Sequence, residues 1–100
     1  MIHALKTLPK YFEEVRLGTK RFELRKNDRD FRVGDYLALN EWDKATQAYT
    51  GRTELVSITH MMNPNDIMTC RGNFVILSIL KISSFGCDIR ISKEEGSRGQ

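Results

Sequence analysis

A charged segment near residue 20 carries the side chains best suited to binding or catalysis. Residues 18–25 follow the pattern G-x-K-x-x-E-x-R, which brings Lys20, Glu23 and Arg25 close together in the chain. A carboxylate beside a guanidinium offers an acceptor and a two-pronged donor, which suits a planar polar ligand such as a nucleobase. An internal ion pair that fixes the local structure explains Glu23 and Arg25 equally well. Both interpretations stay open.

Lys20 also has two interpretations. It can contact phosphate or act as a base, or it can be an ordinary solvated lysine. If the strand already includes Lys20, alternation places its side chain on the opposite face of the strand from that of Glu23. A turn just before the strand would bring both side chains into one cleft.

The charged segment continues as Lys-Asn-Asp-Arg-Asp over residues 26–30. Its Asn and Asp residues favour a loop, because such side chains bond to their own backbone. We expect Lys26 and Asn27 to extend the binding surface. Arg29 remains as a solvent-facing donor, whose expected role is phosphate contact.

Three other residues complete the candidate ligand-binding set. His3 can stack on a base or carry a proton, although a hydrogen-bonded structural role is the more common one for such a histidine. Lys6 adds a cation in the same N-terminal segment. Trp42, between Glu41 and Asp43, is the best candidate for an exposed stacking ring.

Apolar spacing predicts the elements that position these side chains. Ile2 to Lys6 indicates a strand, and Leu8 to Leu17 a helix, because apolar residues recur at offsets 0, 3, 4 and 7. Thr7 is expected to cap this helix, Pro9 lies in its first turn, and Gly18 ends it. The chain then alternates, so that Phe22 and Leu24 face away from Glu23 and Arg25.

Further strands are predicted at Tyr36 to Trp42, about Arg52 to Met61, and Phe74 to Ile82, the last buried on both faces. Residues 43–51 form a hairpin connection, and residues 62–72 contain turn signals without an assignable element. The predicted class is α+β, mainly β: a small barrel of about five strands with one main helix near the N-terminus. A two-layer sandwich is the alternative.

Composition predicts one domain over residues 1–83, followed by a partly disordered extension over residues 84–100. The net charge of +3 and 29% charged residues are typical of a globular protein. Cys70 and Cys87 lack metal-ligand spacing, so we expect free thiols, no metal and no cofactor. The chain has no long apolar run, so we expect a cytoplasmic location and no membrane partner.

The order strand, helix, G-x-K-x-x-E-x-R, V-G-D and a long apolar C-terminal strand resembles the ASCH domains of the PUA-like superfamily. More narrowly, the chain is similar to the small bacterial and phage proteins of the family DUF3850, from residue 1 to about residue 82. The run K-N-D-R-D-F at residues 26–31 is the most specific part of the match. The resemblance implies a PUA-like pseudobarrel with its helix beside a cleft.

The superfamily points to RNA and modified nucleosides. We therefore predict a binding module for RNA, a nucleotide or a modified nucleoside. Some small ASCH proteins are amidohydrolases acting on N4-acetylcytidine, with a lysine, a threonine and a glutamate. Lys20 matches that lysine, but Glu23 replaces the threonine and removes its hydroxyl.

Two alternatives stay open. The first is an amidohydrolase, with Lys20 as base or nucleophile and Glu23 as proton acceptor. The second is a phage-type accessory protein that binds a host protein.

Overall fold

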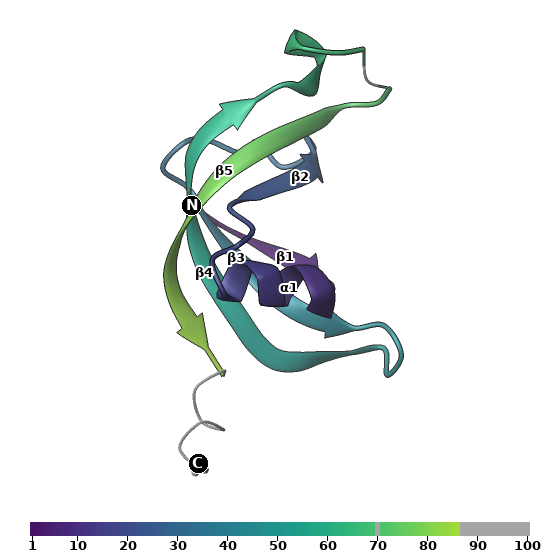
Figure 1. Ribbon diagram of the computed structural model, residues 1–100, viewed down its shortest axis with the longest axis vertical. Coiled ribbons are helices and arrows are strands. Elements are labelled where there is room, and N and C mark those ends of the chain that lie inside the picture. Colours follow the sequence, from purple (N-terminus) through teal and green to yellow (C-terminus); the bar gives the residue numbers. More distant parts are fainter. Residues whose placement is uncertain (70, 87–100) are drawn as a thin grey trace.

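The computed structural model describes residues 1–69 and 71–86, in which five strands and one α-helix form the fold (Figure 1). The elements in chain order are β1 (Ile2–Thr7), α1 (Pro9–Arg16), β2 (Phe22–Lys26), β3 (Tyr36–Asp43), β4 (Ala48–Met62), the short 3-10 helix η1 (Pro64–Asp66) and β5 (Phe74–Phe85). This confirms the predicted mainly β class with one main helix. Of the extension predicted over residues 84–100, residues 84 and 85 belong to β5 instead, whereas Cys70, Cys87 and residues 88–100 lie outside the described residues.

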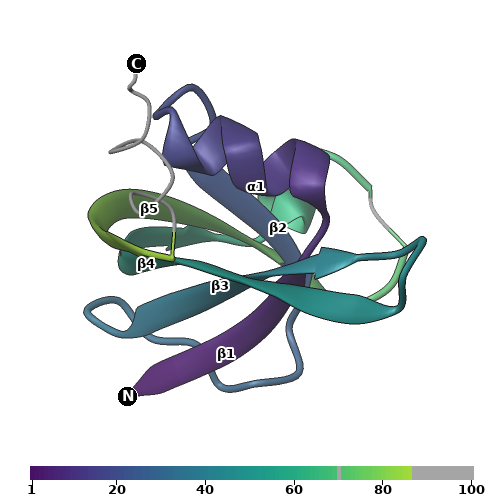
Figure 2. The same ribbon diagram turned by 90° about the horizontal axis from the view of Figure 1, so that it is seen from below.

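The strands form one sheet in the order β1-β3-β4-β5-β2. Strand β1 runs parallel to β3, and the other neighbours are antiparallel. The sheet curls into a half-barrel with α1 across its open side (Figures 1 and 2). Because of this curl the two edge strands approach each other, and Arg25 on β2 reaches the carbonyl of Lys6 on β1.

The core lies between the concave face of the sheet and α1. It contains alternate residues of the strands and one side of the helix, as periodicity predicts. Its buried members include Leu5, Phe12, Val15, Leu37, Leu39, Val56, Ile58, Val75, Leu77 and Ile79. The helix begins at Pro9, and Gly18 follows its end with a φ of +83°, a conformation that favours glycine.

The predicted cap at Thr7 is wrong. Leu8 is the N-cap residue of α1, and it makes no side-chain capping bond. Thr7 instead ends β1 with its side chain buried. The strand continues to the residue before the cap, so the hydroxyl points into the sheet's concave side.

Burial also differs from expectation along β2 and β5. On β2 the polar face is the inner one, because Glu23 is buried while Phe22 and Leu24 are exposed. On β5 the prediction of burial on both faces is wrong, since Leu80 and Ile82 are about half exposed. Within residues 1–69 and 71–86 the sheet is a single layer, and no second layer from these residues covers its convex face.

The β3–β4 hairpin is tighter than predicted. Strand β4 begins at Ala48 instead of Arg52, and the turn takes only residues 44–47. The unassigned segment contains η1, which Asn63 caps by accepting a bond from the backbone N–H of Asn65 at 2.9 Å. Among the described residues no helix is both long enough and apolar enough to cross a membrane.

Candidate functional site

A cavity of about 450 Å³ opens where the edge strands β1 and β2 meet the start of α1. We call it the β1–β2 cavity. Its walls combine charged side chains with exposed apolar and aromatic ones. The lining residues are Lys6, Thr7, Leu8, Tyr11, Lys20, Phe22, Glu23, Leu24 and Arg25.

The charged wall of this cavity is the triplet predicted from the sequence. Glu23 is 3% exposed, and its two carboxylate oxygens have different partners. Lys20 Nζ lies 2.7 Å from Oε2, and Arg25 Nε lies 2.9 Å from Oε1. Glu23 and Arg25 therefore form an ion pair and also line the cavity, so the two interpretations of these residues are compatible.

Lys20 reaches Glu23 from the turn after α1, although alternation alone would have separated them. Its ammonium also donates to the carbonyl of Phe22 at 2.7 Å. The same nitrogen lies 4.8 Å from the centre of the Phe22 ring and 5.8 Å from that of Tyr11. Two exposed rings thus flank the charged group, at distances that allow cation–π attraction.

Sequence reasoning missed these rings as part of the site. Tyr11 lies at a position of the apolar face of the helix, and Phe22 at a position of the apolar face of its strand. Both positions predict side chains that pack in the core. In the structure Tyr11 is 45% exposed and Phe22 is 49% exposed. Both lie at the mouth of the half-barrel, where α1 and β2 no longer cover each other.

Arginine side chains bridge the two edge strands. Arg25 Nη2 donates to the Lys6 carbonyl at 3.2 Å and to Thr7 Oγ1 at 3.3 Å. Arg29 Nη1 donates to the Ala4 carbonyl at 2.9 Å. An edge strand leaves such carbonyls without a ladder partner, and here the guanidinium groups bond to them. Among the described residues, side chains of Arg25 and Arg29 therefore span the gap between β1 and β2.

Two smaller hollows adjoin the β1–β2 cavity through shared lining residues, the first between β1 and the segment after β2, the second between that segment and the start of β5. One of about 250 Å³ is lined in part by Arg25, Lys26, Asp28 and Arg29. The next, of about 330 Å³, is lined in part by Lys26, Asn27 and Asp28. Shared residues join the three hollows into one row. Among the residues that line these three hollows are Lys6, Lys20, Glu23, Arg25, Lys26, Asn27 and Arg29.

The structure places His3 away from this row. Its side chain is buried, its Nε2 lies 2.8 Å from Asp35 Oδ2, and its ring packs against Phe31 at 4.8 Å. The hydrogen bond from His3 lowers the pKa of Asp35 below its usual value. This geometry is that of a structural histidine, so we leave His3 out of the site.

Trp42 is not among the residues lining the β1–β2 cavity, and it is half-buried instead of exposed. It makes an edge-to-face contact with Tyr49 at 4.8 Å. Lys6 Nζ lies 4.0 Å from the centre of its ring, which connects Trp42 to the cavity through a cavity residue. Trp42 therefore positions Lys6.

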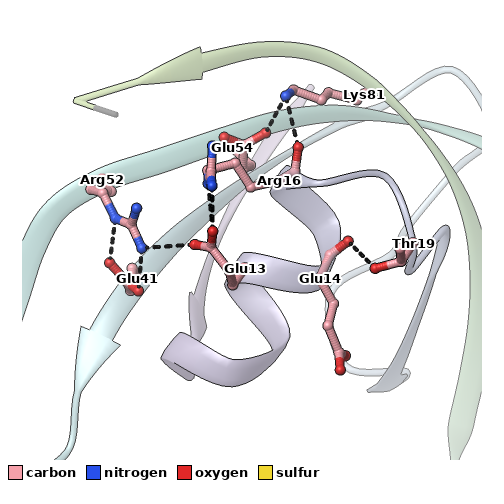
Figure 3. Close-up of polar contacts among 8 residues, drawn as sticks. All are labelled: Glu13, Glu14, Arg16, Thr19, Glu41, Arg52, Glu54 and Lys81. Atoms are coloured by element: carbon pink, nitrogen blue, oxygen red, sulfur yellow. Dashed lines mark hydrogen bonds and ion pairs between the residues drawn. The ribbon is translucent and has the colours of Figure 1, made fainter. Parts of the chain in front are cut away.

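A second cluster of charged side chains links α1 to the sheet (Figure 3). This cluster was not predicted from the sequence. We call Glu13, Arg16, Glu41 and Arg52 the α1 ion-pair network. Arg52 binds both carboxylate oxygens of Glu41, at 2.8 and 2.9 Å, and Glu13 Oε1 at 3.2 Å. Glu13 also pairs with Arg16.

The arginines of this network hold its carboxylates in the charged form. The hydrogen bond from Arg52 lowers the pKa of Glu41, and that from Arg16 lowers the pKa of Glu13. Nearby, fully buried Glu54 lies 3.6 Å from Lys81 Nζ (Figure 3).

The signal that could have revealed these glutamates is strand parity. Glu41 continues the inward positions of Leu37 and Leu39, and Glu54 precedes those of Val56 and Ile58.

In the described ranges, 1–69 and 71–86, no three His, Cys, Asp or Glu side chains are grouped so that they could hold a metal ion. The chemistry available at the β1–β2 cavity is that of two ammonium groups, a guanidinium, a carboxylate and two aromatic rings. These groups can bind an anion, bond to a planar polar edge and stack on a base.

Comparison with known proteins places these observations in a family. The model of the family described as "Domain of unknown function (DUF3850)" matches residues 2–79, which include every residue of the β1–β2 cavity. The "Uncharacterized 12.9 kDa protein in GpA 3'region" of Escherichia phage P2 is 42% identical to this chain over 65 residues. That match covers 65% of this chain and 58% of the phage protein, so the chain spans less than two thirds of that relative.

Proposed function

The chain belongs to the DUF3850 family, and on this premise we propose that its β1–β2 cavity binds a nucleotide or a segment of single-stranded RNA. This is the role implied by the resemblance to ASCH domains of the PUA-like superfamily. The observation that carries the proposal is the Lys20–Glu23–Arg25 triplet on the wall of a cavity flanked by exposed rings. Polar recognition of a base edge and stacking on its face are thus available together.

Charge supports an anionic ligand. Three cationic side chains, Lys6, Lys20 and Arg25, line the β1–β2 cavity with one carboxylate, that of Glu23. The excess of positive charge favours a ligand that carries phosphate. Stacking on Tyr11 or Phe22 would add about 1–3 kcal/mol per base.

The row of hollows supports a strand of nucleic acid over a single nucleotide. Lys26 and Arg29 line the hollow next to the β1–β2 cavity, and both are exposed. Cations beside a base-binding cavity can contact the neighbouring phosphates of a strand. Such contacts position RNA without selecting its sequence.

The test is a fluorescence titration with a labelled single-stranded RNA at two salt concentrations. We expect binding that weakens as salt rises, because each phosphate contact releases counterions. Substitution Arg25→Ala should weaken it, whereas Lys44→Ala, an exposed lysine of the β3–β4 turn, should not. Absence of binding at low salt, or binding insensitive to salt, would contradict the proposal.

One observation favours a second candidate, an amidohydrolase acting on an N-acylated nucleoside such as N4-acetylcytidine. Lys20 Nζ lies 2.7 Å from a buried carboxylate beside the cavity, so Lys20 as base or nucleophile has a proton acceptor in Glu23. Incubation with N4-acetylcytidine followed by chromatography tests it. Unchanged substrate after long exposure would exclude this activity on that compound.

Because one relative is a phage protein, binding of a host protein is a third candidate function. Co-purification from a nuclease-treated host lysate would separate a protein partner from RNA.

A further inference from the structure

The Lys20–Glu23–Arg25 triplet presents its hydrogen-bonding groups in a fixed order. Lys20 bonds to Oε2 of Glu23 at 2.7 Å, and Arg25 bonds to Oε1 at 2.9 Å. The carboxylate therefore lies between two donors. Since Glu23 is 3% exposed and held on both oxygens, the order donor, acceptor, donor exists before a ligand arrives.

Each member of the triplet keeps some bonding capacity. An ammonium has three N–H groups, a guanidinium five, and a carboxylate about four acceptor sites. Within the described part of the chain, Lys20 donates to Phe22 O and Glu23, and Arg25 uses Nε and Nη2. By this count one N–H of Lys20 and further acceptor sites of Glu23 remain for a ligand, whereas the remaining Nη1 donors of Arg25 lie on the opposite edge of the guanidinium from the Nε–H that bonds to Glu23.

Nucleobases differ in how their edges fit this order. The Watson–Crick edge of uracil presents carbonyl, ring N–H and carbonyl, so in either orientation a carbonyl can face Lys20 while the ring N–H faces Glu23. Guanine also has a ring N–H beside a carbonyl. Cytosine and adenine instead carry an unprotonated ring nitrogen beside an amino group. The lone pair of that nitrogen would point at a lone pair of the Glu23 carboxylate, and the N–H groups of the amino group would point at a cation.

We propose that the β1–β2 cavity selects bases with a protonated ring nitrogen next to a carbonyl, uracil above all, and that Glu23 determines this selectivity. The inference rests on the proposed function, because it specifies which base the cavity takes. Lys20 bonds to the carbonyl beside the ring N–H, Glu23 accepts from that N–H, and Arg25 holds the Glu23 carboxylate in place. Tyr11 and Phe22, on either side of Lys20, provide the stacking faces.

The test compares uridine and cytidine 5′-monophosphates by titration of the whole chain. The two ligands share ribose and phosphate, so their difference reports on the base edge. We expect the uridine nucleotide to bind about tenfold tighter or more, the discrimination that a well-placed set of base contacts supplies. Oligouridine and oligocytidine give the same comparison at higher affinity if the mononucleotides bind too weakly to measure.

A substitution of Glu23 tests whether this residue determines the selectivity. Glu23→Gln replaces one acceptor oxygen by an amide NH2, which can donate to the bare ring nitrogen of cytosine, so the preference for uridine should fall toward equality. The matched control is Glu41→Gln, because Glu41 is also a nearly buried carboxylate bound to an arginine, but outside the cavity. This control should keep the preference.

Each outcome decides between the two claims. Equal binding of both bases by the unsubstituted chain, or tighter binding of cytidine, overturns the inference and leaves the proposed function standing. A preference unchanged in Glu23→Gln overturns the role of Glu23. If no nucleotide and no single-stranded RNA binds at low salt, the proposed function fails and the inference fails with it.

Discussion

Glu23 and Glu41 are two almost buried carboxylates paired with arginine, yet their surroundings differ. Arg52 binds Glu41 through both oxygens, and Thr50 adds a bond of 2.6 Å. Glu23 receives a single bond on each oxygen, from two different residues, and lines the β1–β2 cavity. Under the proposed function, the two pairs differ in saturation and access more than in burial or charge: Glu41 is saturated by its partners, and Glu23 lines a cavity.

Removing Arg52 should show the structural side of this comparison most strongly. Arg52→Ala leaves Glu41 buried and charged without its main partner, and loss of one partner from such a pair costs about 3–5 kcal/mol. Denaturant unfolding measures the change. Arg32→Ala, in an exposed pair with Asp30, is the control and should cost little. A loss at Arg52 no larger than at Arg32 would be inconsistent with a structural role for the network.

Tyr11 tests the binding side. Tyr11→Ala should weaken RNA binding by about 1–3 kcal/mol, the value of stacking one base, with little loss of stability because the side chain is 45% exposed. Isothermal titration measures the affinity. Tyr36→Ala is the matched control, because Tyr36 is 40% exposed and outside the cavity. Equal effects of the two substitutions would argue against stacking in the cavity.

Acid should destabilise the α1 ion-pair network. The pKa values of Glu41 and Glu13 are lowered in the folded chain by the arginines that bind them. Their stabilisation is therefore complete above the ordinary glutamate pKa of 4.5, and it is lost as pH falls through the lower folded values.

Urea unfolding at about pH 7 and about pH 4 measures this loss, and it should shrink in Glu41→Gln. An acid loss of the same size in that variant would show that Glu41 does not contribute.

Lys26 should give the smallest effect. Lys26→Ala should reduce the slope of log affinity for RNA against log salt by about 1, with stability unchanged, because Lys26 is exposed beside the cavity. Salt titrations of the variant and of Lys44→Ala measure the two slopes. A slope that stays the same in Lys26→Ala would remove Lys26 from the phosphate contacts.

The parts of the fold that depend on local pattern were predictable. The helix followed from its apolar period and from Pro9 and Gly18, and the strands from alternation. Alternation divides a strand into two faces without saying which one is buried. On β2 the usual preference fails, because at this edge of the sheet the inner face borders a cavity, and Glu23 occupies it.

The site was predictable where its residues are close in the chain. Lys20, Glu23 and Arg25 formed a visible charge pattern, and the structure brings them to one cavity. Pairing of Glu41 with Arg52 depends on the β3–β4 hairpin, and that of His3 with Asp35 on β1 lying beside β3. Strand order and register are properties of the whole sheet, so neither contact could be inferred from spacing alone.

The most direct test of the central claim is a ¹H–¹⁵N NMR titration of the chain with a short uridine oligonucleotide. The proposal predicts that shifts concentrate on the backbone amides of Lys6 to Leu8, Tyr11 and residues 20–25, with Glu41 and Arg52 little changed. Shifts confined to other surfaces, with the amides of residues 20–25 unmoved, would contradict it.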